Sequence, residues 1–335
     1  MTKKIRFGII GTNFISEEFI RCSRLCKEIE LTSVYSRTKQ RGKEFSEKFN
    51  IEKIFIDLEE MLTSNSVDAV YIASPNALHA KQTILCLNHK KHVLCEKPLA
   101  SNQEEVARMI KAAQDNEVLL MEAMILTYLP SLQLIKENLY KIGKVRRYFS
   151  SFCQYSSRYD AYRSGTVLNA FKPELSNGAL VDIGIYPIAV MVFLFGKPDF
   201  AKATGYLLES GVDGAGSVNF TYEEMEANVI YSKIANSYLP SEIQGEEGSI
   251  VIDHIQRMDE IKVHYRNGSI EYLKAVQNKP KMFYEIEGFV QGILQNQIET
   301  KINTHNFSKE VISLLDDIRQ QIGVIYPADE VKNND

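Results

Sequence analysis

The 335-residue sequence has few cysteines, no excess of basic residues and no long apolar run. Its five cysteines are odd in number and widely spaced, which argues against a disulfide framework. Cys22 and Cys26 stand one helical turn apart, but no second Cys or His pair completes a tetrahedral metal site. We therefore expect buried thiols in a reducing cytoplasm, and no bound metal.

Charge and hydropathy exclude two further classes of protein. The net charge of -4 offers no basic surface for nucleic acid. The longest apolar stretch, residues 183–195, is interrupted by Gly184 and Pro187, so no membrane-spanning segment is expected. The start, MTKKIRFGIIG, lacks the longer apolar stretch and the cleavage site of a signal peptide, which predicts a cytoplasmic protein with no membrane partner.

The first part of the chain predicts an α/β domain over residues 1–121. Short β-rich runs alternate here with helical stretches, from a strand at residues 4–10 and a helix at 14–26 to a strand at 118–121. Asp57 is expected to cap one helix, and Ser101 with Glu104 to form a capping box for another. Such alternation is typical of a doubly wound parallel sheet, which makes the fold class α/β.

The pattern changes after residue 122 and predicts a second domain over residues 122–335. A strand over residues 145–155 and an irregular polar stretch precede a helix expected from Gly178 to Phe195. Strand-like runs with turn signals such as Arg266-Asn-Gly268 then lead to closing helices near 283–295 and 308–322. We expect a C-terminal α+β domain on a large, mostly antiparallel sheet, with a C-terminal helix that can pack back on the first domain.

A glycine turn follows the first predicted strand and leads into a helix. Glycine lets the backbone approach a pyrophosphate, and the N-terminus of a helix offers unpaired N–H groups. Asn13 replaces the usual second loop glycine, and its tolerance of left-handed backbone would preserve the turn. The alternative is a turn that only connects strand to helix. The residues expected to bind a dinucleotide here are Gly8, Gly11, Thr12, Asn13, Phe14 and Ile15.

The end of the second predicted strand indicates the cofactor. An NAD-preferring site usually has a carboxylate here for the ribose 2′-hydroxyl, and Ser36-Arg37-Thr38 has none. A hydroxyl and a guanidinium can instead hold a 2′-phosphate, which favours NADP over NAD. If Arg37 only stacks on adenine, both cofactors remain usable.

Three residues form a candidate acid–base set. Lys97 follows the strand predicted at residues 92–95, at an edge where ligands of α/β sheets bind, and Asp182 and Tyr186 are four apart on one face of a predicted helix. Hydride transfer at a carbinol needs a partner for the hydroxyl proton, and an ammonium near a tyrosine favours the phenolate. The alternatives are a surface lysine, a helix-capping carboxylate and a core aromatic.

Together these motifs resemble the glucose–fructose oxidoreductase/inositol dehydrogenase (Gfo/Idh/MocA) family. The resemblance is carried by Gly8-x-x-Gly11, Ser74-Pro75-Asn76-x-x-His79, Glu96-Lys97-Pro98 and Asp182-x-Gly184-x-Tyr186, in that order along the chain. It implies that residues 1–121 form a dinucleotide-binding Rossmann domain, followed by a domain with an open-faced sheet. It also implies a substrate pocket between the domains, and dimers or tetramers built through that sheet. It also implies Lys97 as the active-site lysine, completed by Asp182 and Tyr186. The residues it places beside the cofactor are Ser74, Asn76, His79, Glu96 and Lys97.

The residue at position 186 points to one branch of that family. Many members have histidine there, and Tyr186 resembles the branch of NADP-dependent xylose and trans-dihydrodiol dehydrogenases. This agrees with the Ser36-Arg37 interpretation.

A segment before the third motif is a candidate for substrate contacts. A loop that supplies guanidinium, phenol and amide groups can hold several hydroxyls at once, although a solvated connection with packed tyrosines is the alternative. The residues concerned are Arg158, Tyr159, Tyr162, Arg163 and Asn169. The role of Glu122 is left open, and His254 and His264 are expected at a surface or an interface.

These observations predict an NAD(P)-dependent oxidoreductase that transfers a hydride between nicotinamide and a carbinol or carbonyl carbon. The expected substrate is a sugar, a polyol or a cyclic diol, and the expected assembly a homodimer or homotetramer. Two alternatives stay open. One is a non-catalytic NAD(P)-binding regulator of the same fold, and the other an enzyme that oxidises its substrate transiently and recycles the cofactor.

Overall fold

The computed structural model describes residues 4–330, which divide into two compact units. The first unit consists of the described residues up to Ile125 together with a later segment, Asn278–Lys309. The second unit consists of Leu126–Gln277 together with the described residues from Glu310 onward. This division differs from the single boundary at residue 122 expected from the sequence, because a segment from late in the chain joins the first unit.

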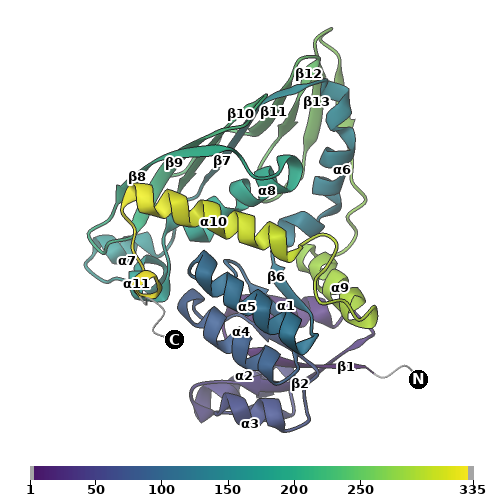
Figure 1. The fold of residues 1–335 in the computed structure, drawn as a ribbon, viewed down its shortest axis with the longest axis vertical. Coiled ribbons are helices and arrows are strands. Elements are labelled where there is room, and N and C mark those ends of the chain that lie inside the picture. Colours follow the sequence, from purple (N-terminus) through teal and green to yellow (C-terminus); the bar gives the residue numbers. More distant parts are fainter. Residues whose placement is uncertain (1–3, 331–335) are drawn as a thin grey trace. The chain divides into compact units, whose positions relative to one another are not determined.

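The first unit is built on a six-stranded parallel sheet in the order β3-β2-β1-β4-β5-β6 (Figure 1). Its strands are β1 (Ile5–Ile10), β2 (Ile29–Tyr35), β3 (Lys53–Phe55), β4 (Ala69–Ile72), β5 (His92–Glu96) and β6 (Leu120–Ala123). Its helices are α1 (Phe14–Ser23), α2 (Lys39–Phe49), α3 (Leu58–Thr63), α4 (His79–Asn88), α5 (Gln103–Asn116) and α9 (Lys281–Leu294), with a short 3₁₀ turn η1 (Asn76–Leu78). The strand order reverses between β1 and β4, which confirms the predicted doubly wound sheet. The sequence analysis missed only the short β3 among these strands.

Aromatic packing explains why a late segment belongs to the first unit. The rings of Phe19 on α1 and Tyr71 on β4 are stacked with centroids 3.9 Å apart. Phe7 on β1 contacts Phe19 and also Phe289 of α9, whose centroid lies 5.9 Å away. Phe289 is fully buried, and burying such a side chain contributes about 1.5–3 kcal/mol. Helix α9 therefore completes a core that the first 125 residues leave open.

Two predicted helix caps have different outcomes. Asp57 accepts a hydrogen bond from the Glu60 amide at 2.8 Å, which confirms it as the cap of α3. The predicted Ser101–Glu104 box is wrong by one residue. Asn102 caps α5 by accepting from the Glu105 amide, and the Glu105 carboxylate accepts from the Ser101 amide. Asparagine caps as well as serine does, so the pattern alone did not fix the register.

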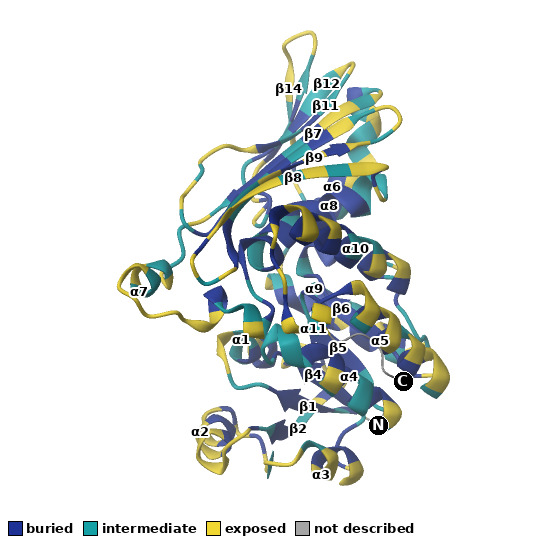
Figure 2. Ribbon diagram, turned by 60° about the vertical axis from the view of Figure 1, so that its left-hand side comes forward, coloured by how far each residue is buried: buried dark blue, intermediate teal, exposed yellow. Residues whose placement is uncertain are grey.

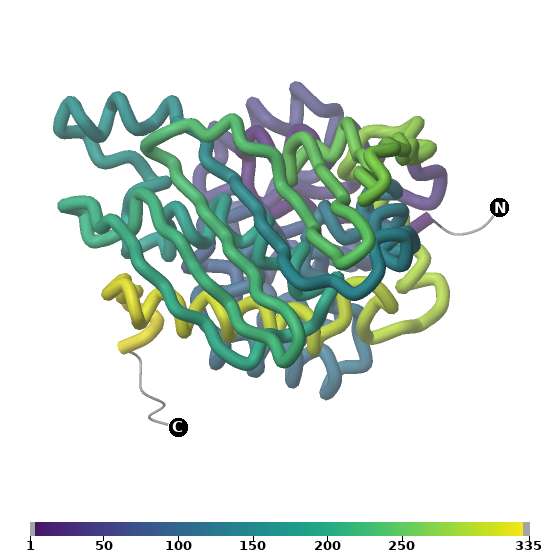
Figure 3. The backbone as a smooth tube through the Cα atoms, turned by 90° about the horizontal axis from the view of Figure 1, so that it is seen from above, coloured from purple at the N-terminus to yellow at the C-terminus, as the bar shows by residue number. Residues whose placement is uncertain are grey.

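The second unit contains an eight-stranded sheet in the order β14-β13-β12-β11-β7-β10-β9-β8, whose strands run side by side in Figure 3. The strands are β7 (Val145–Cys153), β8 (Phe200–Leu207), β9 (Asp213–Thr221), β10 (Glu226–Ser232), β11 (Ser241–Gly245), β12 (Gly248–Ile252), β13 (Ile261–Tyr265) and β14 (Ile270–Leu273). Neighbouring strands are antiparallel except β7 and β10, so the predicted mostly antiparallel sheet is confirmed. Gly268, at a φ of +84°, completes the turn predicted between β13 and β14.

The remaining elements lie before, between and after these strands. They are η2 (Ile125–Tyr128), α6 (Pro130–Asn138), η3 (Leu139–Ile142), α7 (Tyr159–Arg163), η4 (Asn169–Phe171), η5 (Pro173–Leu175), η6 (Leu180–Gly184), α8 (Ile185–Phe195), α10 (His305–Ile322) and α11 (Pro327–Glu330). Helix α10 begins in the first unit and continues in the second.

The two faces of the second sheet differ in burial (Figure 2). One face carries fully buried apolar side chains, among them Val229, Ile243 and Ile250. The other face carries polar and half-buried residues, including Phe149 and Val251. Figures 1 and 2 show no helix of the described part of this unit packed on that face. The alternation follows from the period of two along each strand.

The β8 edge of this sheet is closed by a side chain. The amide nitrogen of Gln321 on α10 donates to the Ala201 carbonyl at 3.0 Å, and its oxygen accepts from the Ala203 amide at 2.9 Å. A further strand paired with β8 would form hydrogen bonds with these same two backbone groups. Gln321 therefore satisfies backbone groups that an edge strand normally leaves exposed.

The helix expected from Gly178 to Phe195 is not a single α-helix. A π-helical turn, η6, precedes α8, and the Ile185 amide bonds to the Leu180 carbonyl five residues back. Pro187 has no amide hydrogen to donate to the Ile183 carbonyl, so the usual register is not enforced at this point.

One stretch of this region is apolar enough to resemble a membrane span, contrary to the expectation from sequence. Pro173–Phe195 passes by length and composition, and 67% of its most apolar window is buried inside the structure. A core helix passes the same test, and the burial of this stretch matches that of a core helix.

Glu122 on β6 fastens three segments of the first unit. Its carboxyl accepts from the Leu99 amide at 3.0 Å and from the Ser308 hydroxyl at 2.7 Å, and its backbone carbonyl accepts from Asn303. Burial raises the pKa of this carboxyl to about 7, although the two hydrogen bonds oppose the rise. The position left open by the sequence is thus a buried structural acid.

Glu122 predicts a pH dependence of stability. Because its folded pKa of about 7 lies above its ordinary value of 4.5, the folded state holds the proton more tightly, and stability should fall as pH rises from about 4.5 to 7, by up to about 3 kcal/mol. Glu122→Gln should flatten this decline in urea unfolding curves, whereas the exposed Glu52→Gln should leave it unchanged. An equal decline in wild type and Glu122→Gln would contradict the assignment.

Candidate functional site

Most predicted cofactor residues lie along one edge of the first sheet. Strands β2, β1, β4 and β5 are direct neighbours and parallel, so their carboxyl ends share that edge. The predicted segments around residues 11–15, 36–37, 74–79 and 96–97 each follow one of these strands. This edge includes the reversal of strand order between β1 and β4, where open α/β sheets bind their ligands.

The turn after β1 requires glycine at position 11. Gly11 has a φ of +106°, and an added Cβ would lie 2.5 Å from the Ala73 carbonyl oxygen. Ser16, the third small residue of the motif, is fully buried. Gly8 is also confined, because an added Cβ would lie 2.9 Å from Val67. The backbone is therefore drawn in tightly, as a dinucleotide-binding turn requires.

Asn13 does not take the left-handed conformation expected of it. Its φ is -102°, and it acts as the N-cap of α1. Its side-chain oxygen accepts from the Ile15 and Ser16 amides, and its nitrogen donates to the Ala73 carbonyl at 2.7 Å. Asparagine thus replaces glycine because its side chain caps the helix and joins the turn to the end of β4. Phe14 beside it is 71% exposed.

The end of β2 carries cationic and hydroxyl groups. Ser36 is buried and Arg37 is exposed, while Thr38 caps α2. Arg41 on α2 extends to the glycine turn and donates to the Thr12 carbonyl at 2.9 Å. The sequence analysis did not include Arg41 among the site residues, and its contact with Thr12 is visible only in the fold.

His79 connects the segments that follow β4 and β5. Its two ring nitrogens lie 2.9 Å from the Ser74 and Pro98 carbonyl oxygens, and the ring is fully buried. Burial lowers the pKa of His79, against the effect of these two carbonyls. Asn76 opens the η1 turn, and the Ser74 hydroxyl donates to Gln82. His79 therefore holds together the two loops on which Ser74 and Lys97 lie.

Glu96 anchors the segment that carries Lys97. The Tyr71 hydroxyl donates to one oxygen of Glu96 at 2.5 Å, and the Lys97 amide donates to the other at 3.3 Å. Burial raises the pKa of the Glu96 carboxyl, opposed by the Tyr71 hydrogen bond. Lys97 itself is half-buried. Glu96 thus fixes the backbone of Lys97 rather than facing solvent.

A further buried acid, Glu285 on α9, was not anticipated. It is 1% exposed, and its Oε2 has no hydrogen-bond partner among the described residues. Burial, followed by the nearby Glu96 charge, raises its pKa well above the ordinary value. Burial therefore favours the protonated form of Glu285. Within residues 4–330 no group of three or more His, Cys, Asp and Glu is arranged to hold a metal ion.

In the second unit, Asp182 of η6 forms an ion pair with Lys233, which follows β10. The Lys233 side chain is only 4% exposed, whereas that of Asp182 is 35% exposed. The ammonium also lies 5.3 Å from the centroid of the buried Phe171 ring, a cation–π contact. Nothing in the sequence near position 182 indicated this lysine.

Asp213 on β9 contacts the start of η6, the turn that carries Asp182. Its carboxylate accepts from the Leu180 amide at 2.7 Å, and it approaches Gly178 so closely that an added Cβ would lie 2.2 Å away. Burial raises the pKa of Asp213 to about 6. Asp213 thus satisfies an amide at the start of η6, the region that carries Asp182.

Tyr186 stands on the first turn of α8 and is half-buried. Its ring centroid lies 5.8 Å from Phe152 on β7, and Phe152 in turn contacts the ring of His254 at 5.2 Å. His254 is thus packed in an aromatic group next to Tyr186 and is half-buried. Tyr186 and Asp182 belong to one unit and Lys97 to the other, so their convergence remains a prediction.

Some residues of the predicted substrate loop are packed against the second unit's core, and others are exposed. Tyr159 and Tyr162 on α7 pack against Phe171, and the Tyr162 hydroxyl accepts from the Ser210 amide at 3.0 Å. Arg158 and Asn169 are exposed. The two tyrosines therefore fit the alternative of packed aromatics, and substrate contacts by Arg158 and Asn169 stay a prediction.

Comparison with known proteins now identifies the family. Residues 5–124 match the oxidoreductase family with an NAD-binding Rossmann fold, and residues 133–251 match the GFO/IDH/MocA C-terminal domain. The chain belongs to the Gfo/Idh/MocA family of oxidoreductases. The resemblance inferred from its motifs is therefore confirmed, and the chain is an NAD(P)-dependent enzyme.

Two curated relatives of this Gfo/Idh/MocA chain match nearly its whole length. The scyllo-inositol 2-dehydrogenase (NADP(+)) IolU of Bacillus subtilis (strain 168) is 53% identical over 326 residues, covering 97% of this chain and 99% of the relative. The trans-1,2-dihydrobenzene-1,2-diol dehydrogenase of Danio rerio is 31% identical and covers 97% of this chain and 99% of its own.

Solved structures support the same fold. Levoglucosan dehydrogenase in complex with NADH superposes with a TM-score of 0.85 at 20% identity, over 97% of this chain and 100% of that one. KijD10, a 3-ketoreductase from Actinomadura kijaniata in complex with NADP and TDP-benzene, gives 0.84 at 24% identity, over 97% and 99%.

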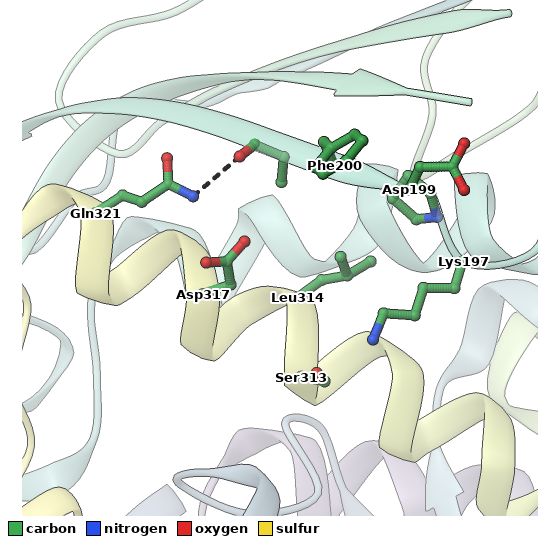
Figure 4. A pocket seen from close by; sticks show the side chains of 9 residues that line it. Lys197, Asp199, Phe200, Ser313, Leu314, Asp317 and Gln321 are labelled. Atoms are coloured by element: carbon green, nitrogen blue, oxygen red, sulfur yellow. Dashed lines mark hydrogen bonds between the residues drawn. The ribbon is translucent and has the colours of Figure 1, made fainter. Parts of the chain in front are cut away.

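A hollow in the second unit of this Gfo/Idh/MocA protein lies apart from the predicted residues. It has a volume of about 360 Å³ and lies between α10 and the start of β8, where Figure 4 shows Lys197, Asp317 and Phe200 around it. Its described lining contains none of the predicted site residues. We therefore do not assign it to the reaction.

Proposed function

We propose that this enzyme uses NADP to interconvert a ring hydroxyl and a ring carbonyl of a cyclic polyol of the inositol type. The observation that carries the proposal is the 53% identity, over 97% of the chain, with a scyllo-inositol 2-dehydrogenase that uses NADP. The dihydrobenzenediol dehydrogenases among the relatives also act on a ring that bears hydroxyls. A cyclic polyol is thus the substrate class that both groups support.

The residues at the sheet edge fit a dinucleotide. The Gly11 turn has room for backbone but not for a side chain, and the N-terminus of α1 follows it directly. The end of β2 offers Ser36, Arg37 and Thr38 with no carboxylate, and Arg41 extends from α2 toward the same turn. These groups suit a 2′-phosphate, because guanidinium binds phosphate in a bidentate manner.

When bound, NADP supplies the hydride acceptor for oxidation of the alcohol, and NADPH the donor for the reverse reaction. In the proposed mechanism Tyr186 takes the hydroxyl proton as the alcohol becomes a carbonyl, and Lys97 stabilises the phenolate. Asp182 accepts a hydrogen bond from a substrate hydroxyl and orients the ring. The mechanism requires Lys97 and Tyr186 to meet at one substrate carbon.

A non-catalytic cofactor-binding regulator is the less supported alternative. Such a protein needs no lysine, carboxylate and tyrosine set, and this chain has all three. The two curated relatives named above are dehydrogenases, and each matches 97% of this chain.

We also infer that the chain assembles through the uncovered face of the second sheet. The face carries Phe149 in the centre of β7, with Ile230 and Val251 on β10 and β12, all half-buried. Half-buried apolar side chains on a broad sheet face are what a second copy would cover.

A cytoplasmic location is a further proposal. Its support is that Cys22, Cys26, Cys86 and Cys95 are buried free thiols, as expected for a reducing compartment. Recovery of the protein in a membrane or extracellular fraction would contradict it.

The mechanism predicts the effect of two substitutions. Lys97→Met and Tyr186→Phe should each lower kcat for inositol oxidation by about a hundredfold or more, because each removes a group that handles the proton. NADPH binding, followed by fluorescence, should stay within a few fold of wild type. Full turnover in both variants would refute the roles, and cofactor binding without turnover of any polyol by wild type would refute the proposed substrate class.

The cofactor assignment predicts a selective loss of affinity. Arg37→Ala and Arg41→Ala should each raise the Kd for NADP by about tenfold to a hundredfold, the loss expected for a hydrogen bond to a charged group. The Kd for NAD should change little. Lys43→Ala, on the same helix α2 and paired with Glu47, is the control. Equal losses for NADP and NAD would show that the arginines do not recognise the 2′-phosphate.

The assembly proposal predicts that the wild-type enzyme sediments as a dimer or tetramer. Phe149→Glu should shift it toward monomer, because a charge would be buried in the contact. Tyr140→Glu changes a residue that is 75% exposed outside the sheet and should leave the sedimentation coefficient unchanged. A monomeric wild type at micromolar concentration would rule the interface out.

A further inference from the structure

The Lys233–Asp182 pair is unusual in how unequally its members are buried. The lysine side chain is 4% exposed and that of the aspartate 35% exposed. A buried ammonium is costly unless it is paired, so Lys233 needs a fixed counter-charge. The pair therefore places a carboxylate on the accessible side with a cation directly behind it.

The position of the Lys233 ammonium is determined by its surroundings. The backbone amide of Lys233 donates to the Gly214 carbonyl, and its carbonyl accepts from the Ser156 amide, each at 2.9 Å. The ammonium lies against the ring of Phe171, which is fully buried in a cluster with Val212. A long lysine side chain held at both ends has lost most of its rotamer freedom, so its partner is positioned as well.

We propose that Lys233 is a positioning residue that holds Asp182 ionised and in one orientation, ready to accept a hydrogen bond from a substrate hydroxyl. This inference rests on the proposed function and deepens it. An ionised Asp182 accepts hydrogen bonds and donates none, so it selects a substrate with a hydroxyl next to the reacting carbon. The proton of the reacting hydroxyl is then left to Tyr186 and Lys97.

Other titratable groups lie around the pair and set its electrostatic surroundings. Asp213 on β9 interacts with the Lys233 charge, and Tyr231 on β10 and Tyr326 beyond α10 lie close to Asp213. Tyr186 is one turn further along the helix from Asp182. The Lys233 ammonium forms an ion pair with the Asp182 carboxylate.

The test compares Lys233→Met with wild type over a range of pH. Without the ammonium Asp182 is protonated more readily, so kcat/KM should fall by up to about a hundredfold and the ratio of wild type to variant should grow as pH falls toward the range in which an aspartate titrates. NADPH affinity should be unchanged. Lys233→Arg, which keeps the charge, should restore the wild-type pH profile even if kcat stays lower.

A matched control comes from the same unit. Lys141→Met removes another lysine–carboxylate pair, with Glu271 at 2.5 Å, and should leave the pH profile unchanged. In the Asp182→Asn background, Lys233→Met should cause no further loss of kcat/KM, because the two residues act as one unit. A loss for Lys233→Met that is the same at every pH, or that adds fully to that of Asp182→Asn, would overturn the proposal.

A second measurement separates this inference from the proposed function. If wild type oxidises no polyol with NADP, the proposed function fails, and the coupling of the two residues is then read from thermal unfolding midpoints of both single variants and the double variant. A double-variant shift smaller than the sum of the single shifts, and more so at pH 8 than at pH 5, supports an ionised pair. Additive shifts at both values reject it.

Discussion

The parallel pairing of β2, β1, β4 and β5 is the constraint on which the first unit depends. Parallel neighbours end at the same edge of a sheet, so residues far apart in sequence lie along that edge. Strand pairing alone brings them there, and no contact between their side chains is required. The loops at that edge are then secured individually. Asn13 joins the glycine turn to the end of β4, His79 joins the loops after β4 and β5, and Glu96 holds the backbone of Lys97.

Those attachments place several acids in the interior. Glu122 and Glu285 are buried and Glu96 is half-buried, and burial raises the pKa of all three. Glu96 and Glu122 are compensated by hydrogen bonds from Tyr71, Leu99 and Ser308, whereas one oxygen of Glu285 is not. A buried carboxyl oxygen without a hydrogen bond lowers stability, and burial favours the protonated form of such a carboxyl. The buried acids therefore lower the free energy of unfolding at neutral pH, while the hydrogen bonds of Glu96 and Glu122 fix the loops that they contact.

The sequence allowed the fold class, the family and the position of the cofactor segments to be predicted, because strand–helix alternation and short motifs are local signals. It did not allow Asn13 to be recognised as a cap or Arg41 as a partner of Thr12, since both depend on which loops meet. Lys233 is separated from Asp182 by 51 residues and is brought to it by β10 pairing. Helix α9 packs in the first unit through buried residues such as Phe289, which contacts Phe7. The apolar pattern of a helix predicts that one face is buried but does not indicate what covers it.

The Gln321 amide at the β8 edge has a consequence for how the second sheet can extend. A strand added there would have to displace two hydrogen bonds that are already made, and helix α10 itself stands in the way, with Ile322 against Gly205. At the opposite margin the short β14 ends the sheet. In the proposed assembly, contacts between copies would then lie on the broad face rather than at the β8 margin, which would favour a closed assembly of finite size over an open-ended fibre.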